Sequence, residues 1–119
     1  MKQECNPGGS GGSNLRWVAR NDSLPGQRGT VDVTISEIKN FKELQLCVAY
    51  HDGRILETPL IRRIEGSTIY QGSAYVWYDS GNYINVYYVL DATTGKITFY
   101  HYRNNGSVTT TFAGYFIAT

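Results

Sequence analysis

Histidine, cysteine, charge and long apolar runs are all scarce in this chain, and each scarcity removes a class of function. Two histidines and the lack of a Cys-x-x-Cys pattern leave no credible zinc site. No segment is apolar and long enough to cross a membrane, and the first residues lack the hydrophobic stretch of a signal peptide. We therefore predict no metal, no cofactor and no membrane span.

The charge balance argues against a nucleic-acid partner. The chain has 11 basic and 10 acidic residues, which gives a net charge of +1. Binding to nucleic acid or to an anionic membrane requires a concentrated basic patch, which this sequence does not have. Charged residues make up only 18% of the chain, a share that fits an oligomer better than a free monomer.

The two cysteines, Cys5 and Cys47, are too few to suggest a disulfide framework. Cys47 lies among alternating apolar residues, where a free thiol behaves as a small hydrophobe, and a Cys5–Cys47 bridge is the less favoured alternative. Residues 1–14 are rich in Gly and Ser and are predicted to be a flexible arm. The arm is either an artificial linker or disordered terminus, or a segment that orders on another subunit.

Tyrosine and glycine are abundant, with 10 and 13 residues, and together they favour β structure with tight turns. We predict a single β domain over residues 15–119. Its expected fold is an antiparallel β-sandwich or flattened barrel of about seven to eight strands, ending in a four-stranded meander, with at most one short helical turn. The length allows one hydrophobic core and not two.

Up to residue 73 the predicted elements are short. Residues 30–36 and 44–50 alternate cleanly between apolar and polar or small side chains, which indicates two strands. Residues 37–43 between them fit one helical turn. Pro59 places its segment at a sheet edge, and Gly72 is expected to break or bulge the strand that contains it.

The stretch from Ala74 to Thr119 organises the rest, because its Tyr-rich runs are separated by hairpin signals. The predicted loops are Ser80-Gly81, residues 92–95 and Asn105-Gly106. Turn geometry then fixes the register. The expected partners are Tyr78 with Tyr83, Trp77 with Ile84, Leu90 with Ile97, Tyr88 with Phe99, Tyr87 with Tyr100, Phe99 with Phe112, and Tyr102 with Thr109.

These registers assign the side chains to two faces. The face predicted to be core collects Tyr75, Trp77, Ile84, Val86, Tyr88, Leu90, Ile97, Phe99 and Phe112. The opposite face is unusually aromatic, and its predicted binding or interface residues are Tyr78, Tyr83, Tyr87, Tyr100, Tyr102, Tyr115 and Asn85. Three interpretations stay open: cross-strand pairing for sheet stability, a subunit interface, and a platform on which sugar rings stack.

No arrangement of residues indicates catalysis, so we predict a protein that is not an enzyme. His51-Asp52 lies in a predicted hairpin turn, where Asp belongs for backbone reasons. His101 is expected to be buried rather than to act as a general base. Residues 91–96 superficially resemble a calcium loop, but only Asp91 carries a carboxylate, so a hairpin is the better interpretation.

The segment from Ser36 to Val48, SEIKNFKELQLCV, resembles small β domains of bacteriophage tail and baseplate proteins. In those domains a strand leads into an Ile-x-x-Phe-x-Glu-Leu segment that is followed at once by a second apolar strand. The resemblance implies a virion structural or receptor-binding module, homotrimeric as such domains usually are, that acts on host-surface glycans or proteins. The arm of residues 1–14 would join it to other virion proteins.

From these features we predict a non-enzymatic phage virion module, associated with a tail or fibre. Its Tyr-rich sheet face would serve subunit packing or host-surface recognition. The alternative is a secreted or lipid-anchored bacterial β-sandwich that binds carbohydrate, because a cysteine before a Gly/Ser tether also fits a lipoprotein.

Overall fold

The structure is a computed structural model that describes residues 15–24, 26–50, 53–77, 80–105 and 110–119. Most of these residues lie in strands, because β-branched and aromatic side chains recur along nearly every segment. The elements in chain order are β1 (Arg16–Leu24), β2 (Arg28–Thr34), the 3₁₀ helix η1 (Ser36–Asn40), β3 (Glu43–Tyr50), β4 (Ile55–Glu57), β5 (Ile61–Arg62), β6 (Ile69–Trp77), β7 (Tyr83–Asp91), β8 (Lys96–Arg103) and β9 (Thr110–Ala118).

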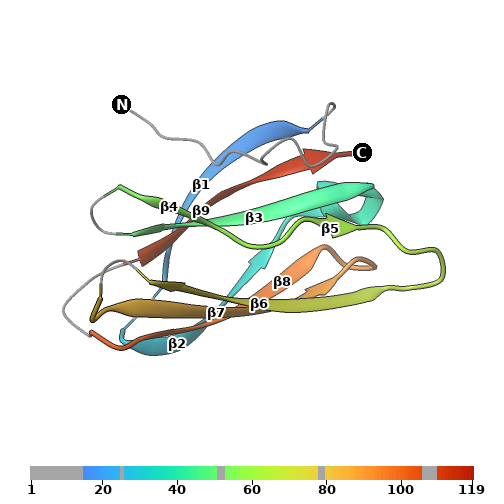
Figure 1. Cartoon of the computed structure of the whole chain (residues 1–119). Coiled ribbons are helices and arrows are strands. Elements are labelled where there is room, and N and C mark those ends of the chain that lie inside the picture. The colour runs from blue at the N-terminus through green and yellow to red at the C-terminus, as the bar shows by residue number, and fades with distance from the viewer. Residues whose placement is uncertain (1–14, 25, 51–52, 78–79, 106–109) are drawn as a thin grey trace.

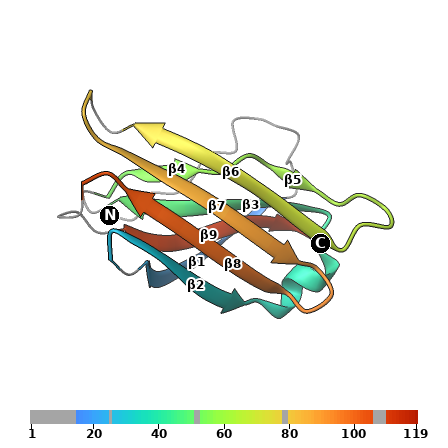
Figure 2. The same ribbon diagram turned by 90° about the horizontal axis from the view of Figure 1, so that it is seen from below.

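Two sheets packed face to face make up the fold (Figure 1). The five-stranded sheet has the order β1-β9-β3-β4, with β5 also paired to β3. The four-stranded sheet has the order β2-β8-β7-β6, and Figure 2 looks onto its outer side. All neighbouring strands are antiparallel. The predicted all-β sandwich with one short helical turn is confirmed.

The core fills the space between the two sheets, and the period-two alternation of the strands supplies it. Along β7, Ile84, Val86, Tyr88 and Leu90 are buried, and the residues between them are partly exposed. β3 differs because it lies inside its sheet with both faces covered, so that Gln45 and Cys47 are also buried. Pro59 lies between the short edge strands β4 and β5, as a residue without an N–H donor should.

The turn between β7 and β8 closes as predicted. The N–H of Gly95, whose φ is 80°, donates to the Asp91 carbonyl at 2.8 Å. The Asp91 carboxylate accepts the Thr93 N–H at 2.9 Å, which is a turn interaction. The predicted pairs of Leu90 with Ile97, Tyr88 with Phe99 and Tyr87 with Tyr100 are all present.

The register between β6 and β7 differs from the prediction by one residue. Trp77 lies opposite Tyr83 instead of Ile84, and Tyr78 is outside the described residues. The observed register does not fit a two-residue Ser80-Gly81 loop, which would place Trp77 opposite Ile84. A shift of one residue moves a strand's side chains to the other face of the sheet. Tyr75 and Trp77 therefore point outward, and their assignment to the core is wrong.

The last strand does not extend the meander, so the predicted pairing of β8 with β9 is also wrong. β9 crosses to the five-stranded sheet and lies between β1 and β3, while the free edge of β8 is taken by β2. Residues 114–117 are buried without a break, which requires a central strand covered on both faces. Phe99 and Phe112 still meet, but across the core, with ring centroids 4.7 Å apart.

This crossing removes Tyr115 from the predicted binding face. Tyr115 lies in the five-stranded sheet, is only 3% exposed, and donates a hydrogen bond of 2.6 Å to the Glu37 carboxylate. Glu37 also forms an ion pair with Arg16. Burial raises the pKa of Tyr115 well above its usual range, and the bond to Glu37 raises it further. Tyr115 therefore fastens η1 to β9.

Cys47 is disulfide-bonded, so the prediction of a free thiol is wrong. The other cysteine of the sequence, Cys5, lies outside the described residues. Cys47 points to the outer side of the five-stranded sheet, where it packs in a small cluster with Phe116 and Trp17. The alternation of β3 predicts this orientation, but spacing alone does not reveal oxidation of the thiol.

Gly72 does not break or bulge β6, whose pairing with β7 is continuous from Ile69 to Trp77. Its role is to make room for the buried ring of Tyr88, because a Cβ at this position would lie 2.7 Å from the Tyr88 Oη.

We expect Gly72→Ala to lower the free energy of unfolding by about 1–3 kcal/mol through overpacking. Urea denaturation would measure the loss. Ser73→Ala, which changes the next, outward-facing residue, should have little effect; equal losses would contradict this explanation.

The Tyr115–Glu37 bond predicts a stability difference that depends on pH. Tyr115→Phe should cost about 1.5–3 kcal/mol at neutral pH, because it removes a hydrogen bond to a carboxylate. The raised pKa means that the folded state favours the neutral phenol. Its contribution is therefore complete below pH ~10, the unfolded pKa, and is lost as the pH rises toward the folded value. Urea denaturation from pH 7 upward should show the difference between wild type and variant shrinking above pH ~10, whereas a constant difference would exclude this role.

Candidate functional site

The outer side of the four-stranded sheet carries a cluster of rings that we call the aromatic face. It consists of outward-facing residues of β6, β7 and β8: Tyr75, Trp77, Tyr83, Tyr87, Tyr100 and Tyr102. Tyr75, Trp77 and Tyr100 are 65%, 58% and 42% exposed. Tyr83, Tyr87 and Tyr102 are half-buried between them. Contiguous exposed apolar surface of this kind marks an interaction site more often than an ordinary solvated face.

Cross-strand pairing arranges this face in rows that run across the strands. In the first row Trp77 faces Tyr83. The second row is Tyr75, Asn85, Tyr102 and Arg28, and the third is Ser73, Tyr87, Tyr100 and Thr30. The next row, Gln71, Val89, Thr98 and Asp32, has no ring. The aromatic face is therefore confined to the end of the sheet where β7 begins and β8 ends.

Neighbouring rings contact one another in tilted pairs, with interplanar angles of 34–52° and centroid distances in the range that aromatic pairs prefer. The centroid of Tyr83 lies 4.8 Å from that of Trp77, 5.5 Å from Tyr75 and 6.0 Å from Tyr102. Tyr87 and Tyr100 are 5.2 Å apart. Tyr83 thus lies at the centre of the cluster, and each ring contacts at least one neighbouring ring.

The hydroxyls keep this surface neutral and partly polar. Removal of Tyr83 from water raises its pKa, and the neighbouring Tyr102 and Tyr75 raise it further. The Tyr87 hydroxyl donates to the Gln71 side-chain oxygen at 2.8 Å. Below Tyr83, the Asn104 side chain accepts the Tyr83 N–H and donates to the Gly81 carbonyl, both at 2.7 Å, which holds the start of β7 in place.

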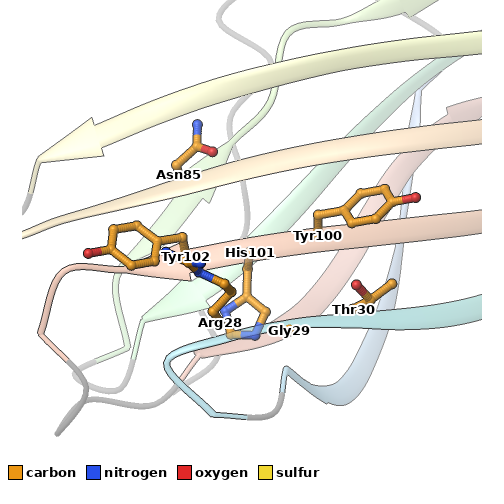
Figure 3. Close-up of a pocket in the computed structure, with 7 residues that line it drawn as sticks. All are labelled: Arg28, Gly29, Thr30, Asn85, Tyr100, His101 and Tyr102. Carbon is orange, nitrogen blue, oxygen red and sulfur yellow. The ribbon is translucent and has the colours of Figure 1, made fainter.

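A groove of about 450 Å³ opens beside Tyr100 and Tyr102 (Figure 3). Tyr100 and Tyr102 point to the same side of β8, and Thr30 and Arg28 lie opposite them on β2. Gly29 lies between those two β2 residues and also lines the groove. The lining residues are Arg28, Gly29, Thr30, Asn85, Tyr100, His101 and Tyr102.

The groove has one permanently charged side chain on its border. The Arg28 guanidinium lies over the Tyr102 ring, 5.0 Å from its centroid, in a cation–π contact. The nearest outward charges along β2 and β8, Asp32 and Lys96, pair with each other at 3.7 Å. The site thus combines ring surfaces, a hydroxyl, an amide and one cation, which are groups that can contact a polar ligand.

The structure brings together five of the predicted residues: Tyr83, Tyr87, Asn85, Tyr100 and Tyr102. Tyr78 lies outside the described residues, and Tyr115 is buried in the other sheet.

The sequence interpretation missed four outward-facing side chains of the site. Tyr75 and Trp77 were missed through the one-residue shift in register. Arg28 and Thr30 were missed because nothing in the local sequence indicates that β2 pairs with β8, although the alternation of residues 30–36 correctly predicted an outward-facing side of that strand.

Among the described residues no group of three or more His, Cys, Asp and Glu side chains could hold a metal ion. No helix of those residues has the length and hydropathy needed to cross a bilayer. His101 is buried at 3% exposure, as predicted, while His51 and Asp52 lie outside the described residues.

Comparison of the chain with protein-family models, curated proteins and solved structures finds no match. The resemblance of residues 36–48 to phage tail domains therefore stays a prediction.

The ring contacts predict energetic coupling across β7 and β8. A double-mutant cycle with Tyr87→Ala and Tyr100→Ala should give a coupling of about 0.5–1.5 kcal/mol in the free energy of unfolding. The control cycle combines Tyr100→Ala with Ile69→Ala, whose side chain is 54% exposed on the same face and far along β6. That pair should be additive, and additivity of both pairs would contradict the described packing.

Proposed function

We propose that this chain is a non-enzymatic receptor-binding module of a phage virion, and that its aromatic face contacts a host-surface glycan. The observation that carries this proposal is the exposure of Tyr75, Trp77 and Tyr100 next to a groove with polar groups. Flat rings stack on the apolar faces of sugars, and hydroxyl and amide groups bind the sugar hydroxyls. The virion setting is supported by the resemblance of residues 36–48 to tail and baseplate domains.

Sheet stability alone is a weaker explanation of the aromatic face. Cross-strand pairs contribute roughly 0.2–1 kcal/mol each, and that gain requires the rings to touch one another, not to remain uncovered. Trp77 and Tyr75 lie on β6, an edge strand, and keep more than half of their surface in water. Rigid rings with polar tips bury a large area on binding at little cost in side-chain entropy, which favours a role in recognition.

The proposal includes assembly. In the virion the chain would form a homotrimer, and the arm of residues 1–14 would attach it to other virion proteins. The low charge of the sequence supports an oligomer. Light scattering at several concentrations is the direct test of this part, and a monomer at all concentrations would overturn it.

A second candidate is a secreted or lipid-anchored bacterial β-sandwich that binds carbohydrate through the same face. It is favoured by the disulfide at Cys47, because disulfides persist mainly in oxidising compartments. The neighbouring genes separate the two candidates: tail genes would favour the virion module, and genes of cell-surface proteins would favour the second.

Glycan-array binding of the full chain tests the shared prediction. Trp77→Ala and Tyr100→Ala should each weaken the strongest glycan signals at least about tenfold, because both remove an uncovered ring. Ile69→Ala is the matched control, since it removes an exposed apolar side chain of the same sheet face outside the ring cluster. Circular dichroism would verify that the variants fold. Glycan binding that survives both ring substitutions would exclude the aromatic face. Conversion of a trimer to a monomer by Trp77→Ala would assign the face to subunit packing instead.

A further inference from the structure

The groove differs from the rest of the aromatic face in carrying a positive charge. Of the seven residues that line it, Arg28 alone is permanently charged, and no lining residue is acidic. Within the described part of the chain, the Arg28 guanidinium makes a cation–π contact with Tyr102 and forms no ion pair. By contrast, the outward-facing Lys96 is matched by Asp32.

We infer that the groove binds an acidic sugar, a uronic or sialic acid residue of a glycan, with the sugar carboxylate on Arg28. The inference rests on the proposed glycan-binding function and names the class of sugar. Charge complementarity carries it, because a lone guanidinium beside a neutral aromatic surface attracts a ligand that combines an anion with an apolar face.

The geometry of Arg28 suits a carboxylate. Its contact with the Tyr102 ring restrains the long side chain at the border of the groove. A guanidinium has five N–H donors, and a pair of them matches the two oxygens of a carboxylate. A lysine here would keep the charge but lose the planar pair of donors.

The remaining lining groups fit the uncharged part of such a sugar. Tyr100 and Tyr102 stand two residues apart on one side of β8, so their rings flank the groove. Thr30 and Asn85 border it from β2 and β7. A hydroxyl and an amide can both donate and accept, as sugar hydroxyls require.

A polyanion is a poorer occupant than a single acidic sugar. Nucleic acids and other phosphate chains need several cations in a row, and here the groove offers one. An acidic peptide would satisfy Arg28 but would not need the paired rings beside it. The observations therefore favour a carboxylate on a sugar ring.

Calorimetric titration of the full chain with matched sugars tests the inference. Two pairs of probes are compared. Trigalacturonate and its carboxyl-reduced counterpart test for a uronic acid, and sialyllactose and lactose test for a sialic acid. We expect one acidic probe to bind about tenfold or more tightly than its neutral partner, with an affinity that falls as salt is added. Arg28→Gln should reduce this preference to about twofold or less. Arg28→Lys should retain only part of the wild-type preference for the acidic sugar.

Lys96→Gln is the matched control, because it removes a cation from the same sheet face outside the groove. Its acidic-sugar preference should equal that of the wild type. Equal affinity for acidic and neutral probes, or a preference that survives Arg28→Gln, would overturn the inference and leave glycan binding by the face intact. Binding of an acidic peptide such as a short poly-glutamate, with no binding of either acidic sugar, would also overturn it. Trp77→Ala and Tyr100→Ala should each weaken binding of the acidic and neutral sugars at least about tenfold, and unchanged binding would count against the proposed function itself.

Discussion

The pairing of β7 with β8 is the constraint on which the two faces of the four-stranded sheet depend. A single turn sets it: Asp91 accepts backbone N–H groups from Thr93 and Gly95, and the Gly95 carbonyl accepts the N–H of Ile35 at 2.9 Å. With that register fixed, odd-numbered residues of β7 face water and even-numbered ones face the core. The aromatic face and the hydrophobic core are thus two results of one alignment.

The same alignment explains why the groove and the rings lie together. β2 extends the sheet beyond β8 and places Arg28 and Thr30 level with Tyr102 and Tyr100. β6 extends it on the other side and places Tyr75 level with Asn85. A surface with a cation at one edge and uncovered rings at the other is therefore assembled from four strands. Three of them, β6, β7 and β8, are consecutive in the chain, and β2 is distant in sequence. No short motif could encode it.

Local turn chemistry made part of this predictable from the sequence. The Asp91–Lys96 sequence fits a single hairpin register. That register fixes the alternation of β7 and β8 and places Tyr87 opposite Tyr100. The connection before Tyr83 was ambiguous, because Ser80-Gly81 offers a tight turn that the chain does not use to pair Trp77. The crossing of β9 could not be read from its sequence, since antiparallel neighbours and a move to the opposite sheet both suit a run such as Thr111-Phe112. Only the unbroken burial of residues 114–117 decides between them.

Alternation with a period of two also limits how this chain can change its length. Inserting or deleting one residue within β7 or β8 would exchange its inward and outward side chains beyond that point, exposing aliphatic residues and burying phenols. The turn at Gly66 has no such restriction on length, because it lies outside the strands, although its φ of 87° favours glycine at that one residue. Diversification by insertion should therefore occur in the connections, while the ring-bearing strands vary only by substitution.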